Sequence, residues 1–107
     1  MHTFNLNDLA SDCAKRDSRW SEFLRVDSLS MGIYRLKAGQ PDEQKPHSED
    51  EVYLVISGRA NFQAGDEQQT AGPGTLIFVE RLVEHRFFDI TEDLAVLVFF
   101  APAERSG

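Results

Sequence analysis

Two histidines and a nearby glutamate carry the chemistry that this sequence offers. Alternate positions share one face of a regular strand, and from residue 47 onward they are His47, Glu49, Glu51, Tyr53 and Val55. Carboxylates beside an imidazole, on a face that continues into apolar side chains, are costly to bury without a partner. A bound cation would remove that cost because its charge offsets the carboxylates. The alternation therefore predicts a metal site that uses His47 and Glu51.

His85 is the imidazole that could complete this site, because it begins a later predicted strand. Two imidazoles and one carboxylate are a recurrent ligand set for Fe(II), and the same set suits Mn, Ni, Zn or Cu. Open coordination positions on such an ion are where a substrate or O2 would bind. An ordinary histidine–glutamate hydrogen bond is the alternative, and spacing alone leaves it open. His2, next to the terminus, is not expected to take part.

The composition limits the partners and the location of the protein. Its 107 residues suit one domain, residues 1–107, and leave no room for a second. The net charge of −7 repels nucleic acid and anionic membranes. The longest apolar run, 94–101, is far shorter than the roughly 20 residues of a membrane helix. Without a signal peptide, and with a single cysteine, the chain is expected to be cytoplasmic.

The first part of the chain, residues 1–19, is polar and favours a helix. Asn5 or Asn7 could cap this helix, which would end near Lys15. Apolar residues recur along it at helical spacing up to Cys13. We expect Cys13 to be a buried apolar residue and not a nucleophile, since free cysteines are usually buried.

From Trp20 onward the pattern is one of strands and turns. Runs rich in Val, Ile, Phe, Tyr and Leu alternate with glycine- and proline-containing turns. The predicted strands are 23–27, 29–37, 51–57, 60–64, 75–79, 85–90 and 94–100. Many short strands at close spacing predict an all-β sandwich or barrel.

Patterns of burial can also be predicted from these strands. The runs 52–56 and 94–100 are apolar on both faces. One face would line the interior, and a second sheet, the N-terminal segment or a partner subunit would cover the other. A homodimer is therefore expected. Tyr34 and Tyr53 are interpreted as core residues, with pocket lining as the alternative, and most of the acidic residues between 42 and 51 are expected to be solvated.

The register of these residues resembles the cupin superfamily, whose small proteins fold as a double-stranded β-helix, or jelly roll. The family's first motif runs Gly, five residues, His-x-His, three or four residues, Glu, six residues, Gly. In this chain it runs from Gly39 through five residues to Lys45, then to His47, through three residues to Glu51, and through six residues to Gly58.

The second motif of the family runs Gly, five residues, Pro-x-Gly, two residues, His, three residues, Asn. Here it runs from Gly74 through five residues to 80–82, where the Pro and Gly are missing, then through two residues to His85 and through three to Asp89. The resemblance covers about residues 29–102. It implies a cupin barrel preceded by the short helical segment.

The resemblance also implies a ligand set. In the family, both histidines and the glutamate of the first motif bind a metal together with the histidine of the second. Carried over position by position, these are His47, Glu51 and His85. The family's first histidine is replaced by Lys45. Because an ammonium repels a cation, Lys45 is expected to point away from the site.

A fourth ligand is then open. Gln44 precedes the altered position and offers a carbonyl oxygen, so it is a candidate ligand. Pro46 biases Lys45 toward extended geometry, and a small bulge could turn Gln44 inward. Water is an equal alternative for this place, and Glu49 is a further one.

The function implied is that of a small metal-binding cupin, with a divalent transition metal and a small organic molecule in the barrel. It could be a metal-dependent enzyme of the dioxygenase, isomerase or lyase type, and the fold does not choose among them. Catalytic residues are not identified, although Glu51 or Glu49 is the nearest candidate for a general base. A non-enzymatic ligand-binding domain is the alternative, which the altered first position favours, and a purely structural role is the third.

Overall fold

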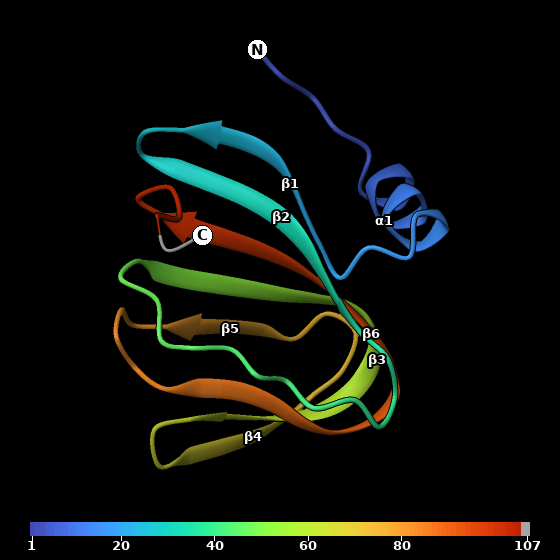
Figure 1. The fold of residues 1–107 in the computed structure, drawn as a ribbon, viewed down its shortest axis with the longest axis vertical. Coiled ribbons are helices and arrows are strands. Elements are labelled where there is room, and N and C mark those ends of the chain that lie inside the picture. The colour runs from blue at the N-terminus through green and yellow to red at the C-terminus, as the bar shows by residue number, and fades with distance from the viewer. Residues whose placement is uncertain (106–107) are drawn as a thin grey trace.

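The computed structural model describes residues 1–105 as a short helix followed by antiparallel strands that form two curved layers (Figure 1). Two long strands bend and take part in both layers. The elements are α1 (Leu6–Lys15), β1 (Trp20–Val26), β2 (Leu29–Leu36), β3 (Asp50–Ala64), β4 (Glu67–Ala71), β5 (Leu76–Val79) and β6 (His85–Ala101). The prediction of an all-β fold with a short N-terminal helical segment is therefore confirmed.

The strand order is β1-β2-β6-β3-β4, and β5 pairs with β3. The first half of β3 pairs with β5 and with the end of β6, as in Tyr53↔Val98. Its second half pairs with β4 and with the start of β6, as in Phe62↔Phe87. The central pair β3–β6 therefore connects the two layers.

The number and extent of several strands were predicted wrongly. The predicted strands 51–57 and 60–64 are one continuous strand, β3, and 85–90 and 94–100 are one strand, β6. Strand β4 was not predicted at all. Four of its five residues are exposed and polar, so it carries no apolar alternation that would indicate a strand.

Gly58 explains why β3 looked interrupted. The sequence suggests a turn at Gly58, whereas the structure places it inside β3 with φ +93°. A Cβ here would lie 2.2 Å from the carbonyl oxygen of Asp93. The register of β3 against β6 shifts between Val55 and Asn61, where both strands bend. Glycine thus permits a close crossing of two backbones and does not end the strand.

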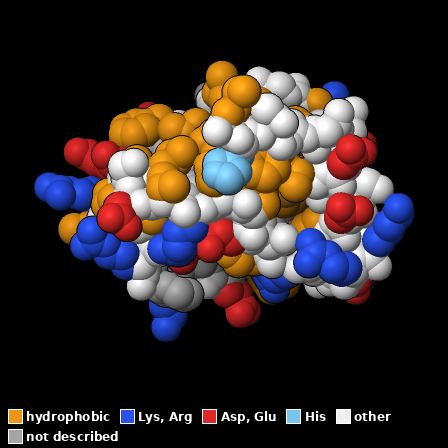
Figure 2. Space-filling view, turned by 90° about the horizontal axis from the view of Figure 1, so that it is seen from above, with side chains coloured by type: hydrophobic (Ala, Val, Ile, Leu, Met, Phe, Trp, Pro, Cys, Tyr) orange, Lys and Arg blue, Asp and Glu red, His pale blue; other side chains and the backbone are white. Residues whose placement is uncertain are grey.

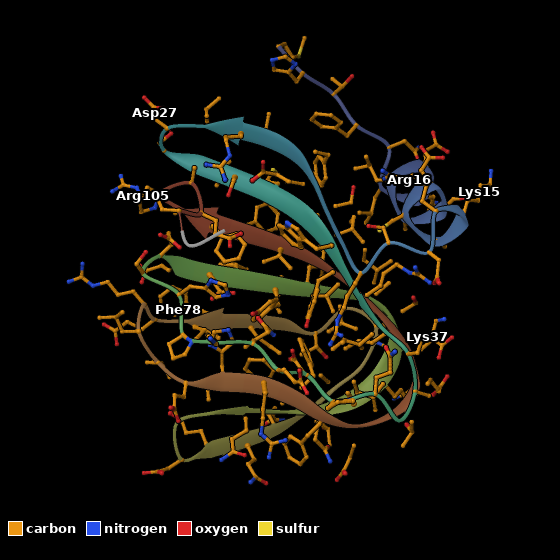
Figure 3. All side chains as sticks on the ribbon, viewed as in Figure 1. Lys15, Arg16, Asp27, Lys37, Phe78 and Arg105 are labelled. Carbon is orange, nitrogen blue, oxygen red and sulfur yellow. The ribbon has the colours of Figure 1, made fainter. Side chains whose placement is uncertain are left out.

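The helix α1 covers the outer face of β2 and β6. Asn5 is its N-cap, and the Asn5 side chain accepts a hydrogen bond of 3.1 Å from the backbone N–H of Asp8. Cys13 is fully buried, as predicted, and packs with Ile33 and Leu97. The N-terminal segment therefore covers part of the outer face of 94–100. It was one of the three alternatives expected for this face. Figure 3 labels Lys15 at the end of this helix and the C-cap Arg16, whose side chain donates to Ser21 of β1.

Aromatic side chains fill the space between the layers. The rings of Tyr53, Phe62 and Phe87 meet edge to face, with centroids 4.7 to 5.5 Å apart. Tyr53 is 1% exposed, which confirms it as a core residue. Within residues 1–105, no helix is long and apolar enough to cross a membrane.

Seen from the side of β1 and the N-terminus, hydrophobic side chains gather on the surface between acidic and basic ones (Figure 2). Exposed apolar residues in this part of the chain are Met1, Phe4, Trp20 and Val26. On the same face, Lys and Arg side chains lie beside Asp and Glu side chains, so the visible surface is not uniformly basic.

Candidate metal centre

The candidate site bridges the two layers of the barrel. Glu51 points inward from the first half of β3, opposite Phe100 of β6. His85 begins β6 in the other layer, opposite Ala64. His47 lies in the loop that leads into β3. The curvature of β3 and β6 thus brings His85 close to Glu51 and His47, which lie 34 and 38 positions before it in the sequence.

Two hydrogen bonds from backbone N–H groups hold the loops next to the histidines. The N–H of Leu82 donates to the carbonyl oxygen of His47 at 2.8 Å, and the N–H of Arg81 donates to the Asp50 carboxylate at 2.9 Å. Leu82 stands where the family motif has glycine and adopts φ +68°. The left-handed conformation is therefore kept here without glycine, at a cost in backbone strain.

The three predicted ligands meet in the interior. One ligand atom from each of His47, Glu51 and His85 lies within 4.8 Å of the others. Glu51 Oε1 is 3.3 Å from His85 Nε2 and 3.9 Å from His47 Nε2. Glu51 and His85 are buried, and His47 is half-buried. The geometry is that of two imidazole nitrogens facing one carboxylate oxygen.

His85 presents a lone pair to this carboxylate. Its Nδ1 lies 2.8 Å from the carbonyl oxygen of Val83, which can only accept, so Nδ1 carries the proton. In the neutral ring Nε2 is then an acceptor. It has no hydrogen-bond partner among residues 1–105, although Glu51 Oε1 is close. Two acceptors therefore face each other unless a proton or a cation lies between them.

Burial shifts the titration of all three residues. Desolvation raises the pKa of Glu51 to about 7, opposed by the hydrogen bond from Tyr53. Desolvation lowers the pKa of both His47 and His85. The nearby charges of Glu49 and Asp42 oppose this lowering for His47. The site therefore favours neutral groups when empty, and neutral imidazoles are the form that binds metals.

A chain of hydrogen bonds begins at Glu51 Oε2, the carboxylate oxygen that does not face the histidines. The hydroxyl of Tyr53 lies 2.6 Å from Glu51 Oε2 and 3.0 Å from Gln44 Oε1. Gln44 Nε2 donates to Asp42 at 2.7 Å, and Asp42 also accepts from the hydroxyl of Tyr34 and the backbone N–H of Phe87. Since a hydroxyl has one proton, Tyr53 donates either to Glu51 or to Gln44.

The candidates for the fourth place have different positions. Lys45 is exposed and lines the two hollows beside the histidines, so its turning away from the site stays a prediction. Gln44 is one hydrogen bond removed from Glu51, through Tyr53. Glu49 is buried and accepts a hydrogen bond from Ser48, and its Oε1 has no partner among residues 1–105. Coordination by Gln44, Glu49 or water stays a prediction.

The expectation that most acidic residues between 42 and 51 are solvated was wrong. Asp42 is 7% exposed, Glu49 1% and Glu51 2%. Each of them has a hydrogen-bond donor from its surroundings, which reduces the cost of burying a carboxylate.

Glu104 was not singled out from the sequence. Its Oε1 lies 3.9 Å from His47 Nδ1, and its side chain is 12% exposed. The N–H of Glu104 donates to Ser30 Oγ, and the N–H of Ala103 donates to the carbonyl oxygen of Asp27. In Figure 3 Asp27 and Arg105 accordingly lie at the same end of the molecule. No local sequence pattern indicates the position of Glu104, because contacts between the C-terminal segment and the distant residues Asp27 and Ser30 determine it.

A small cavity lies beside His47. It has a volume of about 160 Å³ and is lined mainly by Trp20, Tyr34, Tyr53 and Phe100. A second hollow of about 450 Å³ borders His85 from the side of Gln44, Lys45 and Pro46. Small molecules could therefore reach the site from the side of either histidine.

Comparisons with known proteins agree with this architecture. Residues 32–101 match the family described as the cupin domain. The chain is 44% identical to an uncharacterized protein of Streptomyces coelicolor over 104 residues, which is 97% of this chain and 99% of that protein. This level of identity over nearly the whole length relates the two chains throughout.

Solved structures share the fold at lower identity. An RmlC-like cupin with a double-stranded β-helix fold from Methanocaldococcus jannaschii has a TM-score of 0.70 at 16% identity, covering 81% of this chain and 84% of that one. The DMSP lyase DddQ from Ruegeria pomeroyi has a TM-score of 0.69 at 22% identity, covering 82% of this chain. The chain spans 49% of the lyase. These likenesses establish a double-stranded β-helix.

Proposed function

Because the chain belongs to the cupin family, we propose that it is a metal-dependent enzyme that acts on a small organic molecule in the barrel. Its metal would be a divalent transition metal, Fe, Mn, Ni, Zn or Cu, held by His47, Glu51 and His85. The observation that carries this proposal is the 3.3 Å approach of His85 Nε2 to Glu51 Oε1, two acceptors in a buried site.

The residues present fit such an ion. A cation between the two acceptors would satisfy the lone pair of His85 and offset the buried charge of Glu51. The bond from Nδ1 to Val83 supports this role, because metal-bound histidines usually donate their other N–H to a fixed acceptor. Two imidazoles with one carboxylate suit a transition metal better than Ca²⁺ or Mg²⁺, which prefer oxygen ligands.

The protein's own groups would prepare the site for chemistry. A bound metal of this kind supplies a Lewis acid with open positions for substrate or O2. Tyr53 orients the Glu51 carboxylate and can move its proton between Glu51 and Gln44. The aromatic walls near His47 exclude water from part of the site. Gln44 is proposed for the fourth ligand place, since its carbonyl oxygen is held nearby by Tyr53.

The type of reaction is a further step of the proposal. DddQ is named as a lyase, and a lyase, isomerase or dioxygenase activity suits an open metal position. A second candidate is a non-enzymatic domain that binds a small ligand. The replacement of the family's first histidine by Lys45 favours this second candidate, because it removes one expected ligand.

Elemental analysis of the purified protein tests the proposal. After growth in metal-supplemented medium, the wild type and a His2→Ala control are expected to carry close to one transition-metal ion per chain. The His47→Ala/His85→Ala variant is expected to retain roughly a tenth or less. A wild type without metal would contradict the proposal.

Turnover then separates the two candidates. Oxygen uptake and product formation would be measured with small phenols, thiols and keto acids, using the His47→Ala/His85→Ala variant as the control. Metal-dependent turnover supports the enzyme. Saturable binding without turnover favours the non-enzymatic domain.

We also propose that the protein is a homodimer. On the outer face of β5, Leu76 and Phe78 are 68% and 65% exposed. Phe78 also borders a groove of about 490 Å³ to which Val52 and Phe99 contribute. Exposed apolar surface of this kind is typical of an interaction site, and a second copy of the chain would cover it. The cytoplasm remains the proposed compartment, since the single buried cysteine offers no disulfide.

A further inference from the structure

The cavity beside His47 has aromatic walls. Trp20, Tyr34 and Phe100 line it, and its volume of about 160 Å³ equals roughly five water molecules at about 30 Å³ each. The rings of Trp20 and Phe100 meet edge to face, with centroids 6.0 Å apart. The hydroxyl of Tyr34 is fixed to Asp42 at 2.7 Å. These contacts hold the rings in place around a space suited to a small ligand.

The buried charge around this cavity is acidic. Among residues 1–105, the buried carboxylates other than the proposed ligand Glu51 are Asp42, which accepts from the hydroxyl of the lining residue Tyr34, and Glu49. Glu104 lines the cavity with a side chain that is only 12% exposed. Glu49 adds an oxygen that is buried and lacks a hydrogen-bond partner within the described chain. A divalent metal would offset only part of this negative charge.

The nearest cations are at the surface. Lys45 lines the rim of the cavity, Arg25 binds the backbone carbonyl of Glu104, and Arg19 lies near Tyr34. All three residues are exposed. Solvent and salt screen exposed charges much more than buried ones, so the buried carboxylates determine the potential inside the cavity.

We propose that this cavity binds a small organic cation, an alkylated ammonium, in preference to a carboxylate or a phosphate. Aromatic faces attract such cations, and nearby carboxylates supply the counter-charge. The inference rests on the proposed function, because it names the substrate class of that same site. An occupant of the cavity would lie beside His47, and its far end would face the proposed metal.

Three probes of matched shape test the preference for positive charge. Choline carries the charge, 3,3-dimethylbutan-1-ol is its neutral carbon analogue, and 3,3-dimethylbutanoate is an anion of similar shape. Binding would be measured by calorimetry on metal-free protein, and by the fluorescence of Trp20, the single tryptophan of the chain. Choline is expected to bind about tenfold more tightly than the alcohol, and the anion more weakly than both.

Three variants test where the preference arises. Glu104→Gln and Phe100→Leu are each expected to reduce choline affinity several-fold while changing the affinity for the alcohol little. Phe88→Leu, an aromatic substitution on β6 outside the cavity, is the control and should leave both affinities unchanged. If Phe100→Leu does not fold, Glu104→Gln alone decides, because it keeps the shape of the side chain.

The outcomes separate this inference from the proposed function. Equal affinity for choline and the alcohol, a preference for the anion, or no saturable binding of choline would each overturn the inference. Because these titrations use metal-free protein, selective choline binding together with a failed elemental analysis would leave the inference standing and reject the metal proposal. Full metal content without a preference for the charged probe would support the metal proposal and reject the inference.

Discussion

His85 Nε2 lies 3.3 Å from Glu51 Oε1, yet neither atom can donate to the other when the imidazole is neutral and the carboxylate ionised. Burial raises the pKa of Glu51 to about 7 and lowers that of His85, mainly by desolvation. A proton on Glu51 would relieve the contact in the metal-free protein. A metal ion would have to displace that proton, and two measurable consequences follow from this competition.

Metal affinity is expected to depend on pH through Glu51. Below pH 7 a proton occupies the carboxylate, so the affinity should fall by about tenfold for each pH unit of acidification. Above pH 7 it should level off. The histidines, whose pKa values are lowered, stay neutral over this range and add little. Competition titrations of Zn²⁺ against a chromophoric chelator from pH 6 to 8 measure this. A constant affinity across that range would refute the competition.

The stability of the metal-free protein should change in the opposite sense. The pKa of Glu51 is raised from 4.5 to about 7 on folding, so its contribution is fully present below pH 4.5 and is lost as the pH rises through 7. The loss amounts to about 3 kcal/mol by pH 8. Glu51→Gln cannot titrate, so it should match the wild type near pH 4.5 and exceed it at pH 8. Urea unfolding at both pH values measures the difference, and parallel behaviour of the two proteins would show that folding does not raise the pKa of Glu51.

Tyr53 should tune Glu51 without binding the metal. Its hydroxyl hydrogen bond lowers the pKa of Glu51, so Tyr53→Phe should move the pH midpoint of metal binding upward and weaken binding at pH 7 by roughly tenfold or more. Tyr34→Phe is the matched control, because it removes a hydroxyl bonded to Asp42 instead of Glu51. Both variants should lose about 1 kcal/mol of stability. Identical metal affinities in the two variants would show that Tyr53 has no such role.

The three proposed ligands could be predicted from the sequence, but their support could not. The inward position of Glu51 follows from strand alternation. His47 lies in the loop before β3, so its place follows, like that of His85, from the register of the two motifs. Asp42 was misjudged as solvated because its neighbours in the sequence are polar. Its burial is compensated by three donors: Gln44 two residues away, the Tyr34 hydroxyl of β2 and the backbone N–H of Phe87 on β6.

Strand pattern also has a limit where the chain bends. Alternation predicts the inward face of β3 from Glu51 to Val55, but it does not reveal that the strand continues through Gly58. The polar strand β4 forms because Ala60 to Ala64 of β3 offer it a partner, although the β4 sequence has little apolar character. Pairing between distant segments decides both features, and one sequence read locally does not contain it.

Gly58 should therefore tolerate substitution less than any exposed turn glycine. Gly58→Ala places a Cβ 2.2 Å from the Asp93 carbonyl oxygen, at φ +93°, and should cost about 4 kcal/mol or more. Gly65→Ala is the control. Its φ is +57° and no atom lies within 4 Å of the added Cβ. Gly65→Ala should therefore lose only about 1 kcal/mol of stability, from backbone strain. Thermal unfolding of both variants measures this, and equal losses would mean that the backbone crossing is not tight.

The exposed face of β5 should determine the proposed dimer. Figure 3 labels Phe78 on β5, and 65% of its surface is exposed. A serine at this position removes the ring without adding charge, so Phe78→Ser should weaken self-association by tenfold or more, as expected for a large aromatic residue at the centre of an interface. Phe4→Ser is the matched control, since Phe4 is also partly exposed but lies before α1, far from β5 in the sequence. Sedimentation velocity over a range of concentrations measures the assembly. A wild type that sediments as a monomer at all of them would contradict the dimer, and a dimer unaffected by Phe78→Ser would place its interface on another face.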